Sequence, residues 1–246
     1  MSTMDAGTAE EEQPALYPTY EALCGPPIRV RLSIHAQRLF WALDGPLTTA
    51  ISVMEKPWTP DSLEPYFQQT SGEGTWHAIS QLPLTEPKVS SITVGVYHLD
   101  WWEDNWFEMH REHYDCGDNA DNDEDEVDLT HFLTCCGVPR PVGKAVKVVV
   151  KPATRDNGFV TIHDYLSVVH PWLMSVRGDI LWALGMEQGD DEPLPSETEL
   201  LVNSDAAEHL MIENRADWIK SRRHMPSLMS KAWVAEYEQM EGRQII

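Results

Sequence analysis

The residues best suited to chemistry are histidines and cysteines on both sides of an acidic segment. His110, His113 and Cys116 are spaced three residues apart, and Cys135 and Cys136 follow the acidic segment. On a helix, side chains three residues apart lie close together, so two of the first three could share one ion. Imidazole nitrogen and thiolate sulfur are ligands that zinc prefers. The sequence therefore indicates a zinc site made by His110, His113, Cys116 and one of the adjacent cysteines, Cys135 being the first choice.

A simpler interpretation stays open from the sequence alone. The histidines could lie at the surface while the cysteines are buried free thiols. Cys135 and Cys136 form neither a Cys-x-x-Cys nor a His-x-x-x-His pair, and two adjacent side chains do not easily point at one ion. Apart from this zinc, the sequence predicts no cofactor.

The acidic segment between the two halves of the predicted site is a candidate surface for a partner. It fails the EF-hand pattern, because Glu126 and Phe132 stand where a glycine and a glutamate are needed. A segment that buries nothing and repels itself is expected to be a flexible loop, here over 117–129. Tryptophans anchor many interfaces, and several precede this loop. The residues predicted to bind a partner are Trp101, Trp102, Trp106, Asp121, Asp123, Glu124, Asp125 and Glu126.

Most of the ten tryptophans are nevertheless expected in the core. In an extended chain Trp101 and Trp102 would point to opposite faces, so that one of them would be exposed.

No catalytic residue is predicted. His163, Asp164 and His170 lie on one expected helix, but no nucleophile or glycine turn accompanies them, and Asp164 is explained as a helix cap. The sequence has no Gly-x-Ser-x-Gly elbow, P-loop, Gly-x-Gly-x-x-Gly or His-Glu-x-x-His motif. An enzyme whose site is assembled from distant residues remains an alternative.

The charge of the chain excludes several classes of partner. Its 246 residues include 18 Lys and Arg against 40 Asp and Glu, which gives a net charge of -22. Such a chain should repel nucleic acid and anionic membranes and attract a basic protein. No segment approaches the roughly 20 apolar residues that cross a bilayer. The acidic first residues and the adjacent cysteines predict reduced thiols in a cytoplasmic or nuclear protein.

The elements that must position these residues are expected as strands first and helices last. Alternating apolar residues predict strands. These strands are expected over 28–35, 39–43, 91–99 and 146–150. Thr161 and Asp164 resemble a capping box that begins a helix, with Pro171 expected to kink or end it. The apolar face of this helix comprises Ile162, Tyr165, Leu166, Val169 and Leu173.

The order of elements predicts an α+β fold with a central, mainly antiparallel sheet and C-terminal helices packed on it. Further helices are expected over 204–223, with Leu210, Met211 and Trp218 on the packing side, and from about 227 onward. The predicted organisation is a disordered tail over 1–14, a main domain over 15–185 and packed helices over 196–246.

The segment Val160-Thr161-Ile162-His163-Asp164-Tyr165-Leu166, which follows a strand and a polar turn, resembles a known family. It is similar to a helix start, valine-threonine-x-x-aspartate-x-leucine, in the C-terminal part of a domain of unknown function common in fungal proteins. The stretch Leu39–Leu43 resembles the tryptophan-containing strand of that family. The likeness covers 28–185 in pieces, and the acidic insertion and C-terminal helices depart from it. The family has no established activity, so the resemblance implies no functional residue.

The leading interpretation is a non-enzymatic interaction or adaptor protein whose acidic loop and tryptophans engage a basic or apolar partner surface. The alternative is a zinc-binding protein or metal-dependent enzyme that uses the histidine and cysteine group.

Overall fold

The computed structural model describes residues 15–26, 30–70, 72–114, 132–154, 157–203 and 205–228. The predicted tail over 1–14, the acidic loop over 117–129 and the helix expected beyond 228 lie outside the described residues. The predicted site residues that also lie outside them are Cys116, Asp121, Asp123, Glu124, Asp125 and Glu126.

A four-stranded sheet forms the centre of the fold, in the order β11-β8-β13-β12. Strand β8 (Ile92–Val96) pairs antiparallel with β11 (Val148–Val150). On its other side β8 pairs in parallel with β13 (His209–Asn214), which pairs antiparallel with β12 (Leu200–Asn203). Only one of the three strand pairs is therefore parallel, and the fold is α+β with a mainly antiparallel sheet, as the sequence predicts.

A second antiparallel sheet continues the first through a single bridge between Ala42 and Leu201. It consists of β2 (Leu39–Trp41), β3 (Ile51–Met54) and β4 (Leu63–Pro65). The bridge lies directly after β2, so the strand predicted over 39–43 both forms and connects the two sheets.

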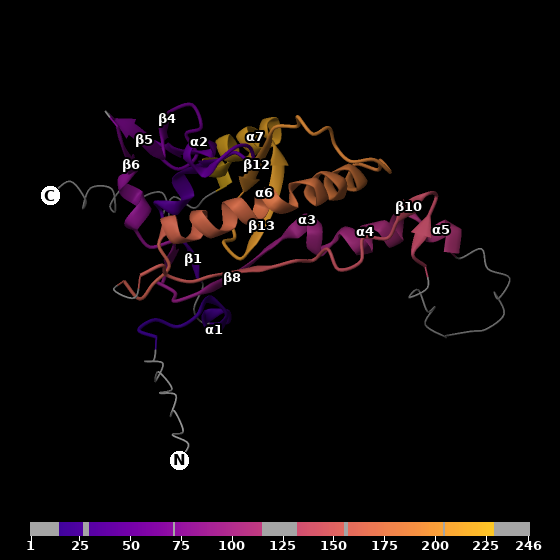
Figure 1. Cartoon of the computed structure of the whole chain (residues 1–246), viewed down its shortest axis with the longest axis horizontal. Coiled ribbons are helices and arrows are strands. Elements are labelled where there is room, and N and C mark those ends of the chain that lie inside the picture. Colours follow the sequence, from indigo (N-terminus) through magenta and orange to yellow (C-terminus); the bar gives the residue numbers. More distant parts are fainter. Residues whose placement is uncertain are drawn as a thin grey trace, which may run out of the picture.

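Helix α6 (Ile162–Glu187) is the longest element that the structure describes and crosses the middle of the molecule (Figure 1). The predicted capping box is confirmed: the Thr161 hydroxyl accepts from the Asp164 amide at 3.0 Å, and the Asp164 carboxylate accepts from the Thr161 amide at 2.9 Å. The predicted apolar face is buried throughout. None of the described helices is long and apolar enough to cross a membrane.

Pro171 was expected to kink or end this helix, and of these two outcomes the end does not occur, because α6 continues to Glu187. A proline inside a helix removes one amide hydrogen bond and its ring crowds the preceding turn. Pro171 is exposed, so this loss lies on the side of the helix that faces solvent. His170 and Leu173, on either side of it, are buried and hold the helix on the core.

The two sheets separate α6 from α7 (Arg215–Leu228). Successive side chains of a strand point to opposite faces. Trp41 accordingly faces α6, where its Nε1 donates to His170 Nδ1 at 3.0 Å. The preceding Phe40 faces α7, where its ring centroid lies 5.1 Å from that of Trp218. The helix α7 therefore covers the face of the sheet opposite α6, with a small core of its own.

The helix predicted over 204–223 is wrong in its first half, where β13 forms. Burial alternates along this segment as in a strand with one buried face. Leu210 and Ile212 are buried, while Met211 between them is 42% exposed. Only Leu210 and Trp218 of the predicted packing residues are buried. The chain after 196 is consequently part of the central sheet and not only a set of helices packed on it.

The strand predicted over 28–35 is also largely wrong. Only β1 (Arg31–Leu32) forms, paired with β7 (Thr85–Glu86), while residues 27–29 lie outside the described part. Ser33 ends the strand, because its hydroxyl donates to the Pro83 carbonyl at 2.7 Å and accepts from the Ala36 amide at 3.3 Å. These bonds begin the short 3₁₀ helix η1 (Ala36–Arg38).

The strand predicted over 91–99 forms as β8 and then turns into a helix. The strand predicted over 146–150 is confirmed at its end as β11. The other described elements are α1 (Tyr20–Leu23), α2 (Leu47–Ala50), β5 (Phe67–Thr70), β6 (Glu73–Trp76), η2 (Ala78–Gln81), α3 (Tyr97–Asp100), α4 (Trp102–Met109), α5 (Arg111–Tyr114), β9 (Thr134–Cys135) and β10 (Val138–Pro139). Figure 1 shows α4, α5 and β10 together at the end of the molecule away from β4, β5 and β6.

Candidate metal centre

His110 is the C-cap of helix α4, and the contacts of its ring leave one nitrogen able to bind a metal. Its ring Nδ1 lies 2.7 Å from the Trp106 carbonyl oxygen. A carbonyl oxygen only accepts, so Nδ1 carries the proton and Nε2 keeps a free lone pair. Nε2 is buried and has no hydrogen-bond partner among the described residues. Fixing one ring nitrogen by a backbone carbonyl while the other stays open is the arrangement found in histidines that bind metal.

Cys135 and Cys136 come from the tight turn of the β9–β10 hairpin. Cys135 pairs with Val138, so the turn consists of Cys136 and Gly137 alone. Both have positive φ angles, 52° and 83°. This is the two-residue hairpin turn that matches strand twist, and a side chain at its first position is strained. The turn brings the two adjacent thiols together, with their Sγ atoms 3.8 Å apart.

Three contacts hold this hairpin on α4. The Phe132 ring centroid lies 5.4 Å from that of Trp106. The Arg140 guanidinium donates to the Glu103 carboxylate at 2.6 Å and lies 4.5 Å from the Phe107 ring centroid. Because these contacts come from residues on both sides of the turn, they fix where the two thiols lie relative to His110.

The ligand atoms of His110, Cys135 and Cys136 all lie within 4.8 Å of one another. His113, on α5, lies beside the two cysteines, with its Nδ1 3.1 Å from each sulfur. A tetrahedral zinc with Zn–S bonds of about 2.3 Å would separate two sulfurs by about 3.8 Å. The Sγ–Sγ distance of 3.8 Å already matches that geometry.

The electrostatic surroundings make Cys135 depend on a cation for its ionisation. Burial, followed by the neighbouring Cys136 and the charge of Asp191, raises the pKa of the Cys135 thiol. A coordinated zinc ion reverses this, because its charge deprotonates a bound thiol. The protonated thiol is therefore favoured, and a bound cation would be needed to turn Cys135 into a ligand.

Asp191 approaches the group from the loop after α6. Its Oδ1 lies 3.9 Å from His110 Nε2. Gly185 allows this approach, because a Cβ at that position would lie 2.0 Å from the Glu192 carbonyl oxygen. The Leu194 amide also donates to the Leu181 carbonyl at 3.0 Å, which fixes the loop on the helix. A carboxylate is thus held next to the histidine and cysteine group.

The structure brings together three of the predicted ligands, His110, His113 and Cys135, and adds Cys136 beside Cys135. The predicted set contained only one of these two cysteines, because adjacent side chains in an extended chain point apart. The dipeptide Cys136-Gly137 indicates a tight hairpin turn, which its glycine favours, and such a turn brings the two cysteine side chains together. Cys116 lies outside the described residues and stays a predicted ligand.

The predicted tryptophan surface is wrong in two of its three members. Trp102 and Trp106 are buried, so in this conformation they do not contact a partner. Trp106 instead packs on the histidine and cysteine group, its ring centroid 4.5 Å from that of His110. Trp101 is 47% exposed, in accord with the expectation that one of the pair Trp101 and Trp102 lies at the surface.

His170 is a structural histidine. Its Nδ1 accepts from Trp41 Nε1 at 3.0 Å, and its Nε2 donates to the Gly45 carbonyl at 2.9 Å. Burial lowers its pKa, so the neutral ring that these two bonds require is favoured. Both ring nitrogens are therefore occupied by contacts that hold α6 on the sheet.

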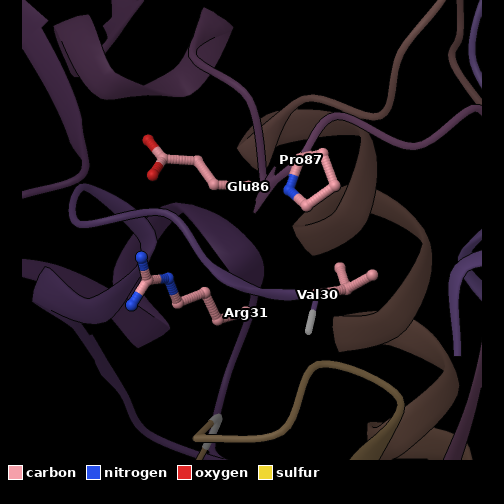
Figure 2. A pocket seen from close by; sticks show the side chains of 4 residues that line it. All are labelled: Val30, Arg31, Glu86 and Pro87. Carbon is pink, nitrogen blue, oxygen red and sulfur yellow. The ribbon is translucent and has the colours of Figure 1, made fainter. Parts of the chain in front are cut away.

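A hollow of about 720 Å³ lies at the β1–β7 pair (Figure 2). Its lining consists of Val30, Arg31, Glu86 and Pro87. Arg31 and Glu86 are partners in register, and Figure 2 shows their side chains extending away from Val30 and Pro87. The lining offers one charge of each sign and no group of metal ligands.

Comparison with models of protein families finds none that matches the chain. Comparisons with curated proteins and with solved structures find no match either. The resemblance to the fungal domain of unknown function therefore stays a prediction, and any function has to be argued from the geometry.

Proposed function

We propose that the chain is a zinc-binding protein in which one ion joins the α4–α5 segment to the β9–β10 hairpin. The observation that carries the proposal is the convergence of His110, Cys135 and Cys136 within 4.8 Å, with His113 Nδ1 at 3.1 Å from both sulfurs. These atoms come from two segments that precede and follow the acidic segment, so the ion would connect the two.

The donor set favours zinc and a structural role. Thiolates and imidazoles arranged tetrahedrally suit zinc better than calcium or magnesium, which prefer oxygen ligands. Four protein ligands close a zinc site, whereas catalytic zinc keeps one position for water or substrate. His110 and Cys135 are buried, whereas His113 and Cys136 are exposed at the edge of the group. A reducing compartment such as the cytoplasm would keep the thiols available as ligands.

Metal content tests the proposal. Protein purified without chelator or immobilised metal is expected to contain about one zinc per chain by mass spectrometry of the elements. Changing Cys135→Ser together with Cys136→Ser should remove it, because hydroxyls bind zinc poorly. The matched control is Cys24→Ser, which changes an exposed thiol on another part of the fold. Zinc that persists in the double variant would contradict the site.

The fourth ligand is tested in the same measurement. His113→Ala and Cys116→Ser are compared, because His113 touches both sulfurs and Cys116 is predicted from its spacing alone. The variant that loses zinc identifies the residue that completes the tetrahedron.

A second candidate function is an interaction protein that uses the acidic loop. His113 and Cys135 meet at 3.1 Å, so the ends of the segment that carries the run Asp118–Asp128 lie side by side. The exposed rings of Tyr97 and Trp101 lie 6.2 Å apart on the neighbouring α3–α4 stretch. Opposite charge would attract a basic protein segment, and the two rings would contact its apolar parts.

A labelled oligolysine peptide tests this second function. Exchanging the seven acids of Asp118–Asp128 for their amides should weaken binding at least about tenfold, since each exposed ion pair contributes up to about 1 kcal/mol. Fluorescence anisotropy at physiological salt provides the measurement. A control in which exposed acids of β6 and α7 are exchanged instead should bind like the unchanged chain. Equal binding by both variants would exclude the loop as the contact.

A further inference from the structure

Two atoms that can only accept a hydrogen bond lie close together beside the cysteine pair. One is Nε2 of His110, whose side chain is 2% exposed and whose Nε2 has no hydrogen-bond partner among the described residues. The other is the carboxylate Oδ1 of Asp191, 3.9 Å away. The ring proton of His110 is on Nδ1, where the Trp106 carbonyl accepts it, so Nε2 keeps its lone pair. Two acceptors do not bind each other, and a cation between them would satisfy both.

The distance between these two atoms suits a shared metal ion better than a shared proton. A hydrogen bond between nitrogen and oxygen spans about 2.7–3.2 Å, so 3.9 Å is too long for one. A tetrahedral zinc with Zn–N and Zn–O bonds of about 2.0–2.1 Å would separate the nitrogen from the oxygen by about 3.3 Å. The carboxylate would therefore have to move by only about half an ångström. The Asp191 side chain is 48% exposed, which leaves it room to do so.

The backbone of the loop after α6 holds Asp191 in this place from both sides. The amides of Asp190 and Leu194 donate to carbonyls of α6 at 3.1 Å and 3.0 Å. The carboxylate is also close to a sulfur of the group. Burial and the neighbouring Cys136 are the main causes of the raised pKa of the Cys135 thiol, and the charge of Asp191 adds to them. The carboxylate is thus next to the cysteine pair as well as the imidazole.

We propose that Asp191 is a ligand of the zinc ion, which then joins the loop after α6 to His110, Cys135 and Cys136. The inference rests on the proposed zinc site and adds a fourth ligand from a third segment of the chain. Aspartate oxygen is a zinc ligand alongside imidazole and thiolate. His113, with Nδ1 at 3.1 Å from both sulfurs, then acts as an outer partner that donates to the thiolates.

Competition with a chromophoric chelator measures the zinc affinity of the full chain and of its variants. Asp191→Asn should weaken zinc binding at least about tenfold, because even the loss of an outer partner of a ligand costs about that much. The matched control is Asp190→Asn, which removes the same charge from an exposed side chain of the same loop. It should change the affinity less than about twofold. The difference between the two variants should persist at about 1 M salt, which screens attraction at a distance.

An ion pair between Asp191 and a protonated His110 predicts the opposite sign. Asp191 would then stabilise the proton that competes with zinc, so Asp191→Asn would leave the zinc affinity unchanged or raise it. That result would overturn Asp191 as a ligand. The zinc site itself would still stand if the double change Cys135→Ser and Cys136→Ser removed the ion. Absence of zinc from the unchanged chain would overturn both the site and the ligand.

Amide hydrogen exchange provides a second readout, which reports where the ion acts on the chain. Zinc added to the metal-free protein should slow exchange both in the hairpin, residues 134–139, and in the loop, residues 188–194, because it holds both segments in place. In Asp191→Asn, at a zinc concentration that saturates the variant, exchange should slow in the hairpin alone. Equal slowing of the loop in the variant and in the unchanged chain would overturn the proposal, since the carboxylate would not be what connects the loop to the ion.

Discussion

Removing zinc with a chelator is expected to lower the thermal stability of the protein, and adding zinc is expected to restore it. An ion that binds only the folded state stabilises it by about 4 kcal/mol when free zinc exceeds the Kd about a thousandfold. Without the ion, the hairpin is held on α4 mainly by the contacts of Phe132 and Arg140. Differential scanning calorimetry before and after chelation, and after readdition of zinc, measures the change.

The variants of the metal centre provide the controls for this result. The double change Cys135→Ser and Cys136→Ser should give a melting temperature that chelator no longer affects, whereas Cys24→Ser should respond like the unchanged chain. The thermal stability gained from zinc should also be lost on acidification, because protons compete with zinc for imidazole and thiolate. A chelator effect of equal size in the double variant would place the stabilising ion elsewhere.

The change Trp218→Ala is expected to destabilise the fold by about 3–5 kcal/mol, the range for deleting a buried tryptophan. Trp218 is fully buried, its Nε1 donates to the Val202 carbonyl at 3.2 Å, and its ring lies edge-on to Phe40. It is the main side chain that α7 contributes to the outer core. The free energy of unfolding, measured with urea, is the readout.

Trp101→Ala is the matched control for this prediction. It deletes the same side chain from a position where the ring is 47% exposed, so its effect should stay within about 0.5 kcal/mol. If both variants lost the same stability, the small core beneath α7 would not hold the helix in place.

Local patterns predicted the local parts of the fold. The start of α6 follows from Thr161 and Asp164, whose side chains satisfy amides within one turn. The alternation of Leu210, Met211 and Ile212 is typical of a strand, but three residues are too few to distinguish that period from a helical one. The helix does not end at Pro171, because the free-energy cost of a proline inside a helix depends on whether its turn faces solvent. That orientation is decided by packing and not by the neighbouring sequence.

The candidate site could be predicted only in part for a similar reason. The spacing of His110 and His113 predicts that both lie on one helix, whereas the structure places His110 at the C-cap of α4 and His113 on the separate short helix α5. That Cys136 joins Cys135 depends on a turn of two residues, and that the hairpin reaches His110 depends on Phe132 and Arg140 packing on α4.

The parallel pairing of β8 with β13 has a consequence for the order of assembly. His98 directly follows the β8–α3 junction, yet its Nε2 accepts from the Ile212 amide, 114 residues further along the chain. One edge of β8 therefore stays without its partner until the segment around Ile212 has been synthesised. Contacts between such distant residues slow folding, because the long intervening chain must be ordered before they form. The four-stranded sheet is therefore complete only after β13, the last described strand, has paired with β8.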